Sequence, residues 1–432
     1  MSTAFTNPPF GRHPDSWYAA TTKDGPGFAP LDRDIACDIC VVGGGYTGLS
    51  AALHLAQAGL NVVLVEAHVV GYGASGRNGG QVGSGQRLDQ DALARTQGAA
   101  DAHHLWALAQ EAKALTARLI RDHDIDAALR PGIANVVRSA RDLAMAHAYA
   151  ERLARDYGYD QITPLDRAAT AALIGSDAFA GGTLDHGGAH LHPLRYTHGL
   201  ARAAHAAGAR IFEHSTVAHI DGTTLRLAAG HAIRADQVVL ACNGYLGGLQ
   251  PHVARRVMPI NNFIVATEPL GPDAAHILPD DIAVADDRFV VNYWRRSEDG
   301  RLLFGGGESY GKRFPRDIAA KVRGPMRAIY PGLADIAIEY AWGGTLAITM
   351  KRMPLFARPR PGIWSASGYS GHGVALATLA GRILADATQG ERRDFDVMAR
   401  IPIAPFPGGR ALGSPILALA MTWFALRDRI GI

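Results

Sequence analysis

A glycine-rich turn between two apolar segments near the N-terminus narrows the possible folds of this chain most strongly. Residues 38–66 read DICVVGGGYTGLSAALHLAQAGLNVVLVE, which predicts a strand, a helix and a second strand in succession. The turn carries Gly43, Gly45 and Gly48 in the spacing G-x-G-x-x-G, and the second strand ends on Glu66. Together these elements form a complete βαβ unit, which is typical of a domain that binds a dinucleotide.

Each part of this unit has a physical task in holding a nucleotide. Gly43 permits the tight turn, Gly45 lets the backbone approach a pyrophosphate, and Gly48 lets the helix pack close to the strand. The N-terminus of the helix presents N–H groups and a positive dipole end to the phosphates. Glu66 can accept hydrogen bonds from ribose hydroxyls and would repel a 2′-phosphate, so NADP is disfavoured.

A second G-x-G-x-x-G pattern, at Gly71, Gly73 and Gly76, lacks the apolar helix and the acidic strand end that should follow. We therefore expect a loop that lies along the bound cofactor, not a second dinucleotide unit. Backbone N–H groups of this loop and the Arg77 guanidinium can meet phosphate oxygens. The alternative is a flexible surface loop.

The middle of the chain predicts a second domain inserted into the nucleotide domain. Residues 89–157 are expected to be helical, and a helix over 196–208 and a strand over 210–217 are expected to return to the nucleotide domain. A buried strand over 237–241 belongs to the same domain. Residues 256–348 are β-rich, which suits a separate sheet that covers a substrate cavity.

A third glycine-rich turn near the end of the chain favours FAD over NAD. A strand over 362–367 runs through the turn 368–373 (GYSGHG) into a helix over 374–386. The positive end of this helix would stabilise the anion formed when a flavin is reduced. The expected boundaries are 36–90, 196–250 and 349–395 for the FAD-binding domain, 91–195 and 251–348 for the substrate domain, and 396–432 for a C-terminal tail with a docking helix.

The composition argues against several other classes of protein. The 43 basic and 40 acidic residues give a net charge of +3 and form no blocks, so no nucleic-acid partner is expected. Three cysteines and an N-terminus without an apolar signal segment suggest a reducing cytoplasm. The longest apolar run near an end, 416–426, is shorter than the roughly 20 residues that span a bilayer. We expect a docked terminal helix there, with an interfacial helix as the alternative.

Three weaker signals receive less specific interpretations. Cys37 and Cys40 form C-x-x-C, but residues three apart on a strand point to opposite faces, so no redox pair is expected. His190 and His192 could bind a metal together, but no carboxylate lies at a convincing spacing, and we expect ordinary polar histidines and no metal site. The segment 293–296 (YWRR) either recognises substrate or forms a strand with solvated arginines.

The combined motifs resemble the FAD-dependent amine oxidoreductases of the D-amino-acid oxidase (DAO) superfamily, and within it the γ-glutamylputrescine oxidase group. The glycine motifs are specific only for the superfamily, whereas GASGRNGGQ and the FPGG tail are more particular to this group. The matching pieces cover nearly the full length: Ser16-Trp17-Tyr18, VVGGGYTGLSAALHLA, VGYGASGRNGGQ, HLHPLRYTHGLARAA, RLLFGGGES, GYSGHGVALATLAG and FPGGRALGSPILALA.

The resemblance implies an α/β fold in which a Rossmann-like FAD-binding domain is joined to a discontinuous, antiparallel-sheet (α+β) substrate domain. The stretch GGTLAITMKRMPLF, where the sarcosine oxidase branch attaches flavin to a cysteine, contains none, so FAD is expected to be non-covalent. The strand RLLFGGG also lacks the lysine that assists oxygen in that branch. The residues implied to contact FAD are Gly43, Gly45, Tyr46, Thr47, Gly48, Glu66, Ala67, Ala74, Ser75, Arg77, Asn78, Gly79, Gly80, Gln81, Val217, Gly371, His372, Gly373 and Val374.

The resemblance also implies a reaction. The enzyme would oxidise the C–N bond of an amine (γ-glutamylputrescine, a related primary or secondary amine, or an N-substituted amino acid) to an imine and then an aldehyde, with O2 reduced to H2O2. Tyr293, Arg295 and Trp342 are candidates for binding substrate, and His372 is the catalytic candidate, whose imidazolium would help to stabilise the reduced ring. Two alternatives remain: a dehydrogenase of the same fold that passes electrons to a quinone or carrier protein, and a non-catalytic flavin-binding subunit.

Overall fold

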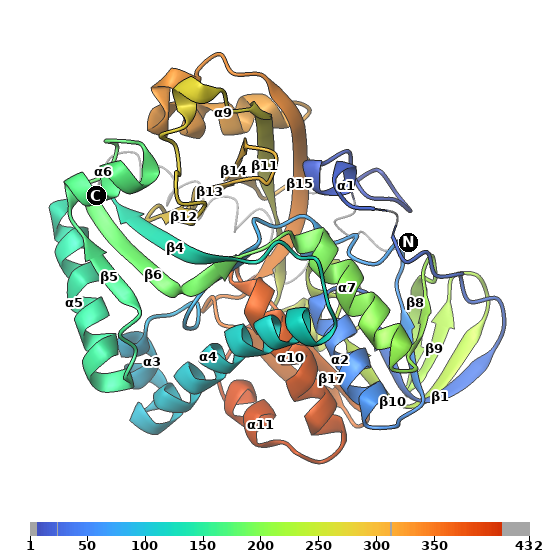
Figure 1. Ribbon diagram of the computed structural model, residues 1–432. Helices are drawn as coiled ribbons and strands as arrows, with labels where there is room; N and C mark the ends of the chain where they lie inside the picture. Colours follow the sequence, from blue (N-terminus) through green and yellow to red (C-terminus); the bar gives the residue numbers. More distant parts are fainter. Residues whose placement is uncertain (1–6, 24, 312, 408–432) are drawn as a thin grey trace.

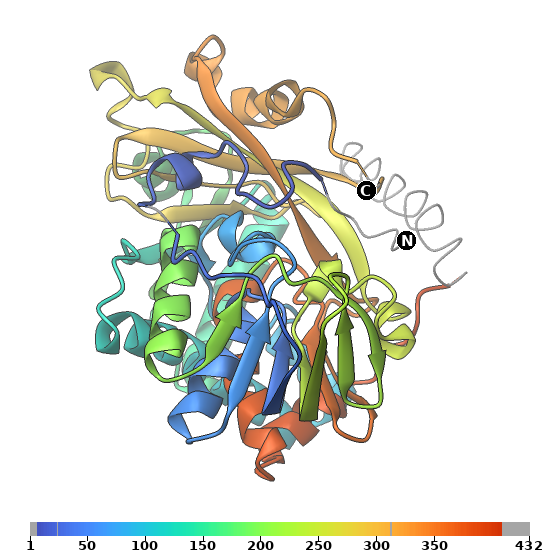
Figure 2. The ribbon, with the colours of Figure 1, turned by 90° about the vertical axis from the view of Figure 1, so that its right-hand side faces the viewer.

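Two β-sheets organise the structure, a computed structural model that describes residues 7–23, 25–311 and 313–407. We name them sheet A, with eight strands, and sheet B, with nine. Figure 2 shows sheet A in the lower half of the molecule and most of sheet B in the upper half. This mixed α/β architecture with two sheets confirms the predicted fold class.

Sheet A has the strand order β16-β17-β10-β1-β2-β7, with β9 paired to β10 and β8 to β9. Its central strands are parallel, and Val41 of β1 lies between Leu64 of β2 and Val239 of β10. These strands are almost continuously apolar because both faces of a parallel sheet are covered. The strands are β1 (Ile35–Val42), β2 (Val62–Val65), β7 (Arg210–Phe212), β8 (Val217–Asp221), β9 (Thr224–Leu227), β10 (Ala232–Leu240), β16 (Leu355–Arg360) and β17 (Ile363–Ser367).

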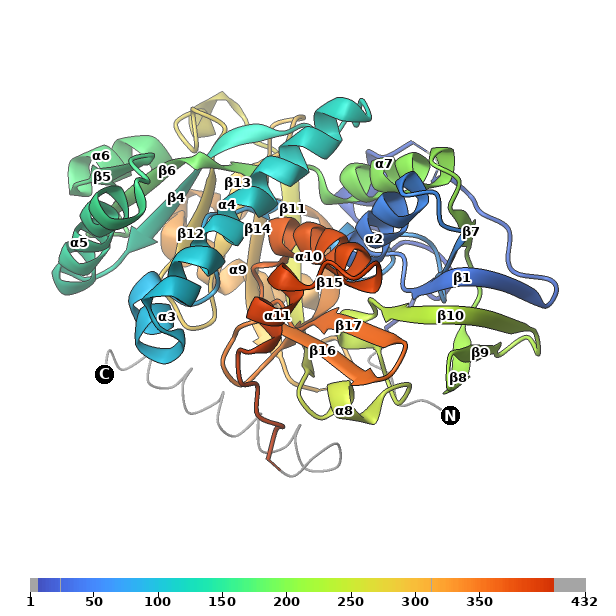
Figure 3. The same ribbon diagram turned by 90° about the horizontal axis from the view of Figure 1, so that it is seen from below.

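A layer of packed helices belongs to sheet A. Helix α10 crosses α2 and also contacts α4, while α2 contacts α7 (Figure 3). A Cβ atom on Gly381 of α10 would lie 2.4 Å from the Thr47 carbonyl oxygen, so only glycine permits this close crossing. The helices are α2 (Tyr46–Gln57), α4 (Ala99–Asp122), α7 (Pro193–Ala206), α10 (Gly373–Thr388) and α11 (Arg393–Ala399).

Sheet B has the order β15-β11-β14-β13-β12-β4-β6-β3, with β5 paired to β6. Its pairs are antiparallel except for β4 with β12. Helix α9 packs on β11, β14 and β15 (Figure 1), and Trp294 stacks on Phe304 in the core beneath. The strands are β3 (Gln81–Val82), β4 (Arg130–Val137), β5 (Ile162–Leu165), β6 (Gly181–His190), β11 (Met258–Pro269), β12 (Ala283–Asp286), β13 (Tyr293–Arg296), β14 (Arg301–Ser309) and β15 (Ile338–Ile348).

The remaining helices are short or lie at the edges of the molecule. Four have at least eight residues: α3 (Gln90–Gln97), α5 (Ala140–Tyr157), α6 (Arg167–Ile174) and α9 (Ile318–Ile329). Two consist of one turn: α1 (Trp17–Ala20) and α8 (Pro251–Ala254). In the part of the chain that the structure describes, no helix combines the length and the apolar character needed to cross a membrane.

Several predicted elements differ from the observed ones. The prediction of a helical region over 89–157 is wrong in its middle, because β4 separates α4 from α5 and pairs with β6. The strand predicted over 210–217 is the short β7 followed by a turn into β8. Strand β3 pairs with β6 in sheet B, although the predicted FAD-binding segment 36–90 includes it. The domain boundaries remain a prediction. The docking helix predicted over 416–426 lies outside the described residues.

The cysteines of the C-x-x-C motif, Cys37 and Cys40, are both buried in β1 as free thiols. Beside them, the N–H groups of Asp38 and Ile39 both donate to the Asn61 carbonyl oxygen, at 3.0 and 3.4 Å. That the two thiols do not act as a redox pair stays a prediction.

Candidate functional site

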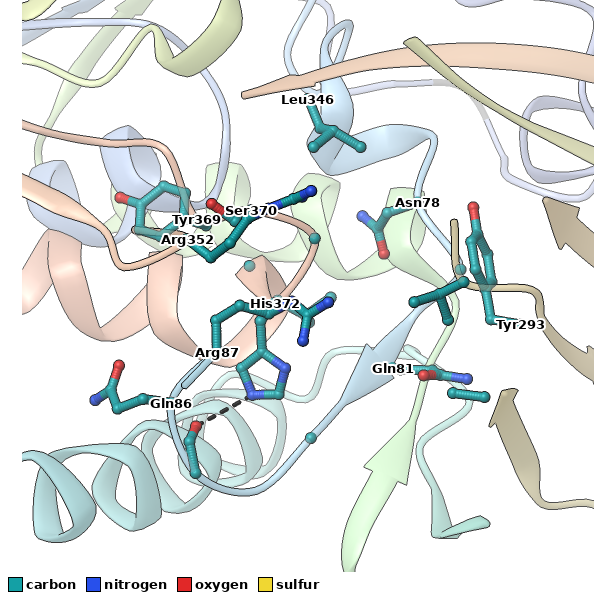
Figure 4. Close-up of a pocket in the computed structure, with 18 of the residues that line it drawn as sticks. Asn78, Gln81, Gln86, Arg87, Tyr293, Leu346, Arg352, Tyr369, Ser370 and His372 are labelled. Carbon is teal, nitrogen blue, oxygen red and sulfur yellow. Dashed lines mark hydrogen bonds between the residues drawn. The ribbon is translucent and has the colours of Figure 1, made fainter. Parts of the chain in front are cut away.

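One cavity of about 590 Å³ gathers most of the residues that were predicted to hold the cofactor (Figure 4). Its wall is formed by the turn before α2, the loop 74–81, the N-terminus of α10 and several strands of sheet B. Five predicted contacts, Gly43, Gly48, Glu66, Ala67 and Val217, do not line it. The predicted cofactor contacts that do line it are Gly45, Tyr46, Thr47, Ala74, Ser75, Arg77, Asn78, Gly79, Gly80, Gln81, Gly371, His372, Gly373 and Val374.

Helices α2 and α10 both begin at this cavity. Their N-cap residues, Gly45 and His372, make no side-chain capping hydrogen bond. An Asp or Ser side chain caps the first turn of α3, α5, α6 and α9. Helices α4 and α11 are also uncapped, but their N-cap residues do not line the cavity. At α2, Ser75 Oγ takes the place of a capping side chain, because it accepts a hydrogen bond from the Tyr46 N–H at 3.1 Å. Uncapped helix N-termini attract anions, so the cavity fits a phosphate at α2 and an electron-rich ring edge at α10.

The turn before α2 depends on glycine at specific positions. A Cβ on Gly48 would lie 1.9 Å from the Gly43 carbonyl oxygen, and Gly43 itself has a φ of +112°. A Cβ on Gly45 would lie 2.8 Å from Ser75 Oγ. These approaches keep the backbone of the turn free of side chains, as a bound pyrophosphate requires.

Glu66 lies at the end of β2, where its carboxylate stabilises the neighbouring backbone. Its Oε2 accepts from the Gly44 N–H at 2.7 Å, and its Oε1 accepts from the His68 N–H at 2.9 Å. Burial raises the pKa of this carboxyl group above its usual range. Each oxygen retains a lone pair, so the carboxylate can still accept hydrogen bonds from ribose hydroxyls. The chain before Val217 runs beside it, with the Ser215 N–H donating to the Glu66 carbonyl oxygen at 2.8 Å.

The loop 74–81 is held by side-chain hydrogen bonds. Asn78 Nδ2 donates to the carbonyl oxygens of Ala74 and Ser75 and to Tyr46 Oη, while Asn78 Oδ1 accepts from the Gly80 N–H at 2.8 Å. The alternative of a flexible surface loop is therefore inconsistent with the structure, because the loop forms part of the cavity wall and is internally braced.

Arg77 does not have the free guanidinium that the sequence suggested. Its Nε donates to the Tyr72 carbonyl oxygen at 2.6 Å and its Nη1 to the Gly343 carbonyl oxygen at 3.0 Å. Only the buried Nη2 has no partner within the described ranges. Arg77 therefore ties the loop to β15, and the expected phosphate contact is limited to this one nitrogen.

Of the three substrate candidates, only Tyr293 lines the cavity. Its ring lies between Gly79 and Gly305, where added Cβ atoms would come within 2.6 and 2.1 Å of it. Its hydroxyl donates to Asn262 Oδ1 at 2.5 Å. Burial raises the pKa of Tyr293, so the phenol stays protonated.

The other two substrate candidates do not line the cavity and are buried behind its wall. Arg295 is 6% exposed and donates to the carbonyl oxygens of Gly79 and Leu191, at 3.0 and 3.1 Å. Trp342 is 2% exposed, and its Nε1 donates to the Arg77 carbonyl oxygen at 3.1 Å. Both side chains brace the cofactor loop, because their donors satisfy carbonyl groups that would otherwise be buried without partners.

His372 is part of the cavity wall, and its ring is neutral near pH 7. Burial and, secondarily, the charge of Arg87 lower its pKa to about 4. Its Nε2 donates to the Gly85 carbonyl oxygen at 3.1 Å, which fixes the tautomer (Figure 4). The imidazolium expected from the sequence is therefore disfavoured, and the N–H groups at the start of α10 are the stronger source of positive potential.

Several charged residues of the wall were not predicted from the sequence. Arg87, Glu308 and Arg352 all line the cavity, although they lie in three different segments of the chain. Ser84 and Asp185 also line it, and they are joined by a hydrogen bond of 2.5 Å. Glu308 lies in the segment RLLFGGGES and Arg352 in the stretch GGTLAITMKRMPLF, but nothing in either segment singles it out, and the other three residues belong to no quoted motif. Only the folded arrangement brings the five together.

The clustered histidines have structural partners. His190 Nε2 donates to the Asp281 carbonyl oxygen at 2.7 Å, and His192 Nδ1 accepts from the Arg195 N–H at 3.3 Å as the N-cap of α7. Burial lowers the pKa of His190 to about 3, of His192 to about 2 and of His198 to about 3. No group of three or more His, Cys, Asp or Glu side chains in the described segments is arranged to hold a metal ion.

These histidines predict a loss of stability in mild acid. The unfolded chain takes up protons near pH 6.5, whereas the folded chain keeps the three rings neutral until the pH is far lower, so stability falls as the pH drops below about 6.5. Each ring contributes a slope of up to about 1.4 kcal/mol per pH unit. We expect the melting temperature to fall between pH 7.5 and 5. The fall in melting temperature should be smaller in His198→Gln than in the wild type. In the control His219→Gln, whose side chain is exposed, it should equal that of the wild type. Equal falls in the wild type and both variants would contradict an origin in the buried histidines.

Comparisons with known proteins agree with this geometry. Residues 38–387 match the DAO family, described as FAD dependent oxidoreductase. The chain is 41% identical to "Probable oxidoreductase OrdL" of Rhizobium meliloti, over 96% of this chain and 97% of that protein. It is 40% identical to the gamma-glutamylputrescine oxidoreductase of Escherichia coli, over 97% and 99% of the two chains. The crystal structure of glycine oxidase from Geobacillus kaustophilus has the same fold, with a TM-score of 0.68 at 20% identity over 82% of this chain and 95% of that one.

Proposed function

Because this chain belongs to the DAO family of FAD-dependent oxidoreductases, we propose that it oxidises the C–N bond of γ-glutamylputrescine or a closely related amine. The carbon next to the nitrogen loses a hydride, for which FAD supplies the acceptor when it is bound. The resulting imine reacts with water to give an aldehyde and an amine or ammonia. In the proposal, O2 finally receives the two electrons and becomes H2O2.

The observation that carries this proposal is the shared cavity. The uncapped start of α2 would hold the pyrophosphate, Glu66 would bind ribose hydroxyls, and the start of α10 would face the electron-rich edge of the flavin. Tyr293 approaches from sheet B, on the side left for substrate. Sheet B thus closes over the nucleotide site, which would exclude water and orient the amine.

Anaerobic titration with amines tests the proposed reaction. A set containing γ-glutamylputrescine, putrescine and N-methylated amino acids is mixed with the FAD-loaded enzyme, and loss of flavin absorbance is followed. We expect γ-glutamylputrescine to bleach the flavin, and air to restore the colour with one H2O2 formed per flavin. If the flavin colour returns only when a quinone is added, the enzyme is a dehydrogenase and not an oxidase. If no amine bleaches the flavin, the proposal fails and a non-catalytic flavin subunit is favoured.

FAD is expected to be held without a covalent bond. The chain has three cysteines, Cys37, Cys40 and Cys242, and the segment after β15 has none. Burial raises the pKa of Cys242 to about 12, so its thiol is a poor nucleophile. Acid precipitation should release all the yellow colour into the supernatant. Colour that remains with the denatured polypeptide would contradict this expectation.

Replacing His372 by alanine is expected to have a modest effect on the reductive half-reaction. The neutral ring contributes no charge, and the N–H groups at the start of α10 remain in the variant. We expect flavin reduction by a good amine to slow by less than about tenfold, below the usual range for a positioned acid or base. Stopped-flow reduction at pH 7.5 measures this rate. A loss of a hundredfold or more with FAD still bound would show that the ring itself takes part.

A further inference from the structure

Three charged side chains on the cavity wall, Arg87, Arg352 and Glu308, have no role in the proposed cofactor site. Arg87 follows β3, Glu308 lies near the end of β14, and Arg352 follows β15. We call them the charged cluster. Figure 4 shows the side chain of Arg87 next to His372 and that of Arg352 beside Tyr369 and Ser370.

Neither guanidinium is neutralised by a direct partner. Within the described ranges, the side chains of Arg87 and Arg352 make no hydrogen bond or ion pair with protein, and Arg352 lies over the Phe289 ring, 5.1 Å from its centroid. Desolvation on the cavity side and then the like charge of Arg352 lower the pKa of Arg87, whereas Glu308 opposes this shift. Arg87 as a whole residue remains exposed. Two neighbouring cations on a partly desolvated wall are unfavourable alone, and an anion that binds both relieves the repulsion.

Glu308 adds a single acidic group to this surface. Tyr310 Oη donates to Glu308 Oε2 at 2.6 Å, which leaves Oε1 for another partner. Burial raises the pKa of Glu308, while Arg352, Arg87 and the exposed Lys321 on α9 oppose this shift. The charged cluster therefore presents two cations and one carboxylate to the cavity, which Asp89, Asp185 and Asp286 also line. Helix α3 begins just after Arg87, but the Asp89 side chain caps its first turn.

We propose that the charged cluster binds the distal head group of the substrate, an α-amino acid with a free carboxylate and a free ammonium group. Arg87 and Arg352 pair with the carboxylate, and Glu308 accepts hydrogen bonds from the ammonium. This inference rests on the proposed function and deepens it, because the amine that is oxidised lies at the other end of the same molecule. A γ-glutamyl amide has this arrangement of groups.

The arrangement explains why an amino-acid head is favoured over simpler anions. A dianionic phosphate would suit the two arginines but would be repelled by Glu308. An uncharged acyl group would leave the two guanidinium groups with only Glu308 of the cluster as a nearby opposite charge. Polar groups of a site that lose their partners disfavour an analogue that lacks the matching group. The charged cluster thus determines substrate specificity at the end of the molecule that is distant from the reacting carbon.

Three putrescine amides separate the contributions. γ-Glutamylputrescine carries both head-group charges, glutarylputrescine keeps only the carboxylate, and butanoylputrescine has neither. In the wild type, kcat/KM should fall in that order. In Arg87→Met and Arg352→Met, we expect kcat/KM for glutarylputrescine divided by kcat/KM for butanoylputrescine to drop by about tenfold or more. A drop of this size corresponds to the loss of one charge-assisted hydrogen-bonded pair. In Glu308→Gln, the ratio for the γ-glutamyl and glutaryl compounds should drop instead.

A binding measurement without turnover gives a second readout. γ-Glutamylmethylamide carries the head group without the distal amine, and its dissociation constant is obtained from perturbation of the flavin spectrum. We expect this constant to rise about tenfold in each arginine variant, while the dissociation constant of FAD stays within twofold. The control Arg358→Met replaces an exposed arginine that lies over Trp364 of sheet A and should change none of these values.

Two outcomes would overturn the assignment. Equal losses of kcat/KM for all three amides in the arginine variants would show that the cluster does not recognise the head group. Weaker FAD binding with unchanged ratios would assign the arginines to the cofactor. Both outcomes differ from failure of the proposed function, which would appear as a wild-type flavin that none of the three amides can reduce.

Discussion

Gly48→Ala is expected to yield a protein that has lost its FAD and melts several degrees below the wild type. A Cβ at this position would lie 1.9 Å from the Gly43 carbonyl oxygen, so either the helix or the turn must move. Overpacking of this kind costs about 1–3 kcal/mol and more where backbone is the obstacle. Because the displaced turn is the proposed pyrophosphate site, we expect FAD occupancy after purification to fall below about a tenth.

A second helical glycine provides the matched control for this substitution. Gly324 lies within α9, and an added Cβ there meets no atom within 4 Å. Alanine has the higher helix propensity, by about 1 kcal/mol, but Pro325 follows directly and disfavours a Cβ on a helical residue before it. Gly324→Ala should therefore keep its FAD and melt within a few degrees of the wild type. The flavin absorbance of the purified proteins and their melting curves measure both effects. Full occupancy in Gly48→Ala would show that the turn can relax without losing the nucleotide.

Glu66→Ala is expected to weaken FAD binding by about tenfold to a hundredfold, the range of one or two hydrogen bonds to a charged group. The substitution removes the proposed ribose contact and leaves the N–H groups of Gly44 and His68 without their acceptor. Since the carboxylate does not line the cavity where the ring would lie, turnover at saturating FAD should stay within about twofold of the wild type. Titration of the apoprotein with FAD and assays at several FAD concentrations measure the two quantities.

Glu66→Gln separates the two contributions of this side chain. The amide retains one carbonyl acceptor for a backbone N–H group but loses the negative charge, so its affinity for FAD should lie between those of the wild type and Glu66→Ala. A large loss of turnover at full FAD occupancy, in either variant, would mean that Glu66 influences the reacting ring and not only the ribose.

The nucleotide half of the site was predictable because its determinants are local. Gly43, Gly45 and Gly48 act within a single turn, and Glu66 is separated from them by one helix and one short strand. The start of α10 was found for the same reason, since the turn 368–373 and the helix that follows are continuous in the chain. In such units, residues that are close along the sequence are also close in space, so their spacing in the sequence predicts the geometry of the site.

The substrate half was predicted poorly because it depends on pairing between distant strands. Arg295 and Trp342 lie on strands that were correctly placed in the β-rich region, but their side chains face Gly79, Leu191 and Arg77 instead of the cavity. Alternation along a strand shows which residues share a face, but not what that face meets.

The sequence alone established a βαβ nucleotide unit, the preference for FAD and a second, β-rich sheet, since each follows from glycine spacing, apolar periodicity or a carboxylate at a strand end. Tertiary structure was needed to reveal that Arg77 is used within the wall and that His372 is neutral, because hydrogen bonding and burial depend on neighbours from other segments. The same holds for the charged cluster. Arg87 is separated from Glu308 and Arg352 by more than two hundred residues along the chain, and the three meet because the two sheets enclose one cavity.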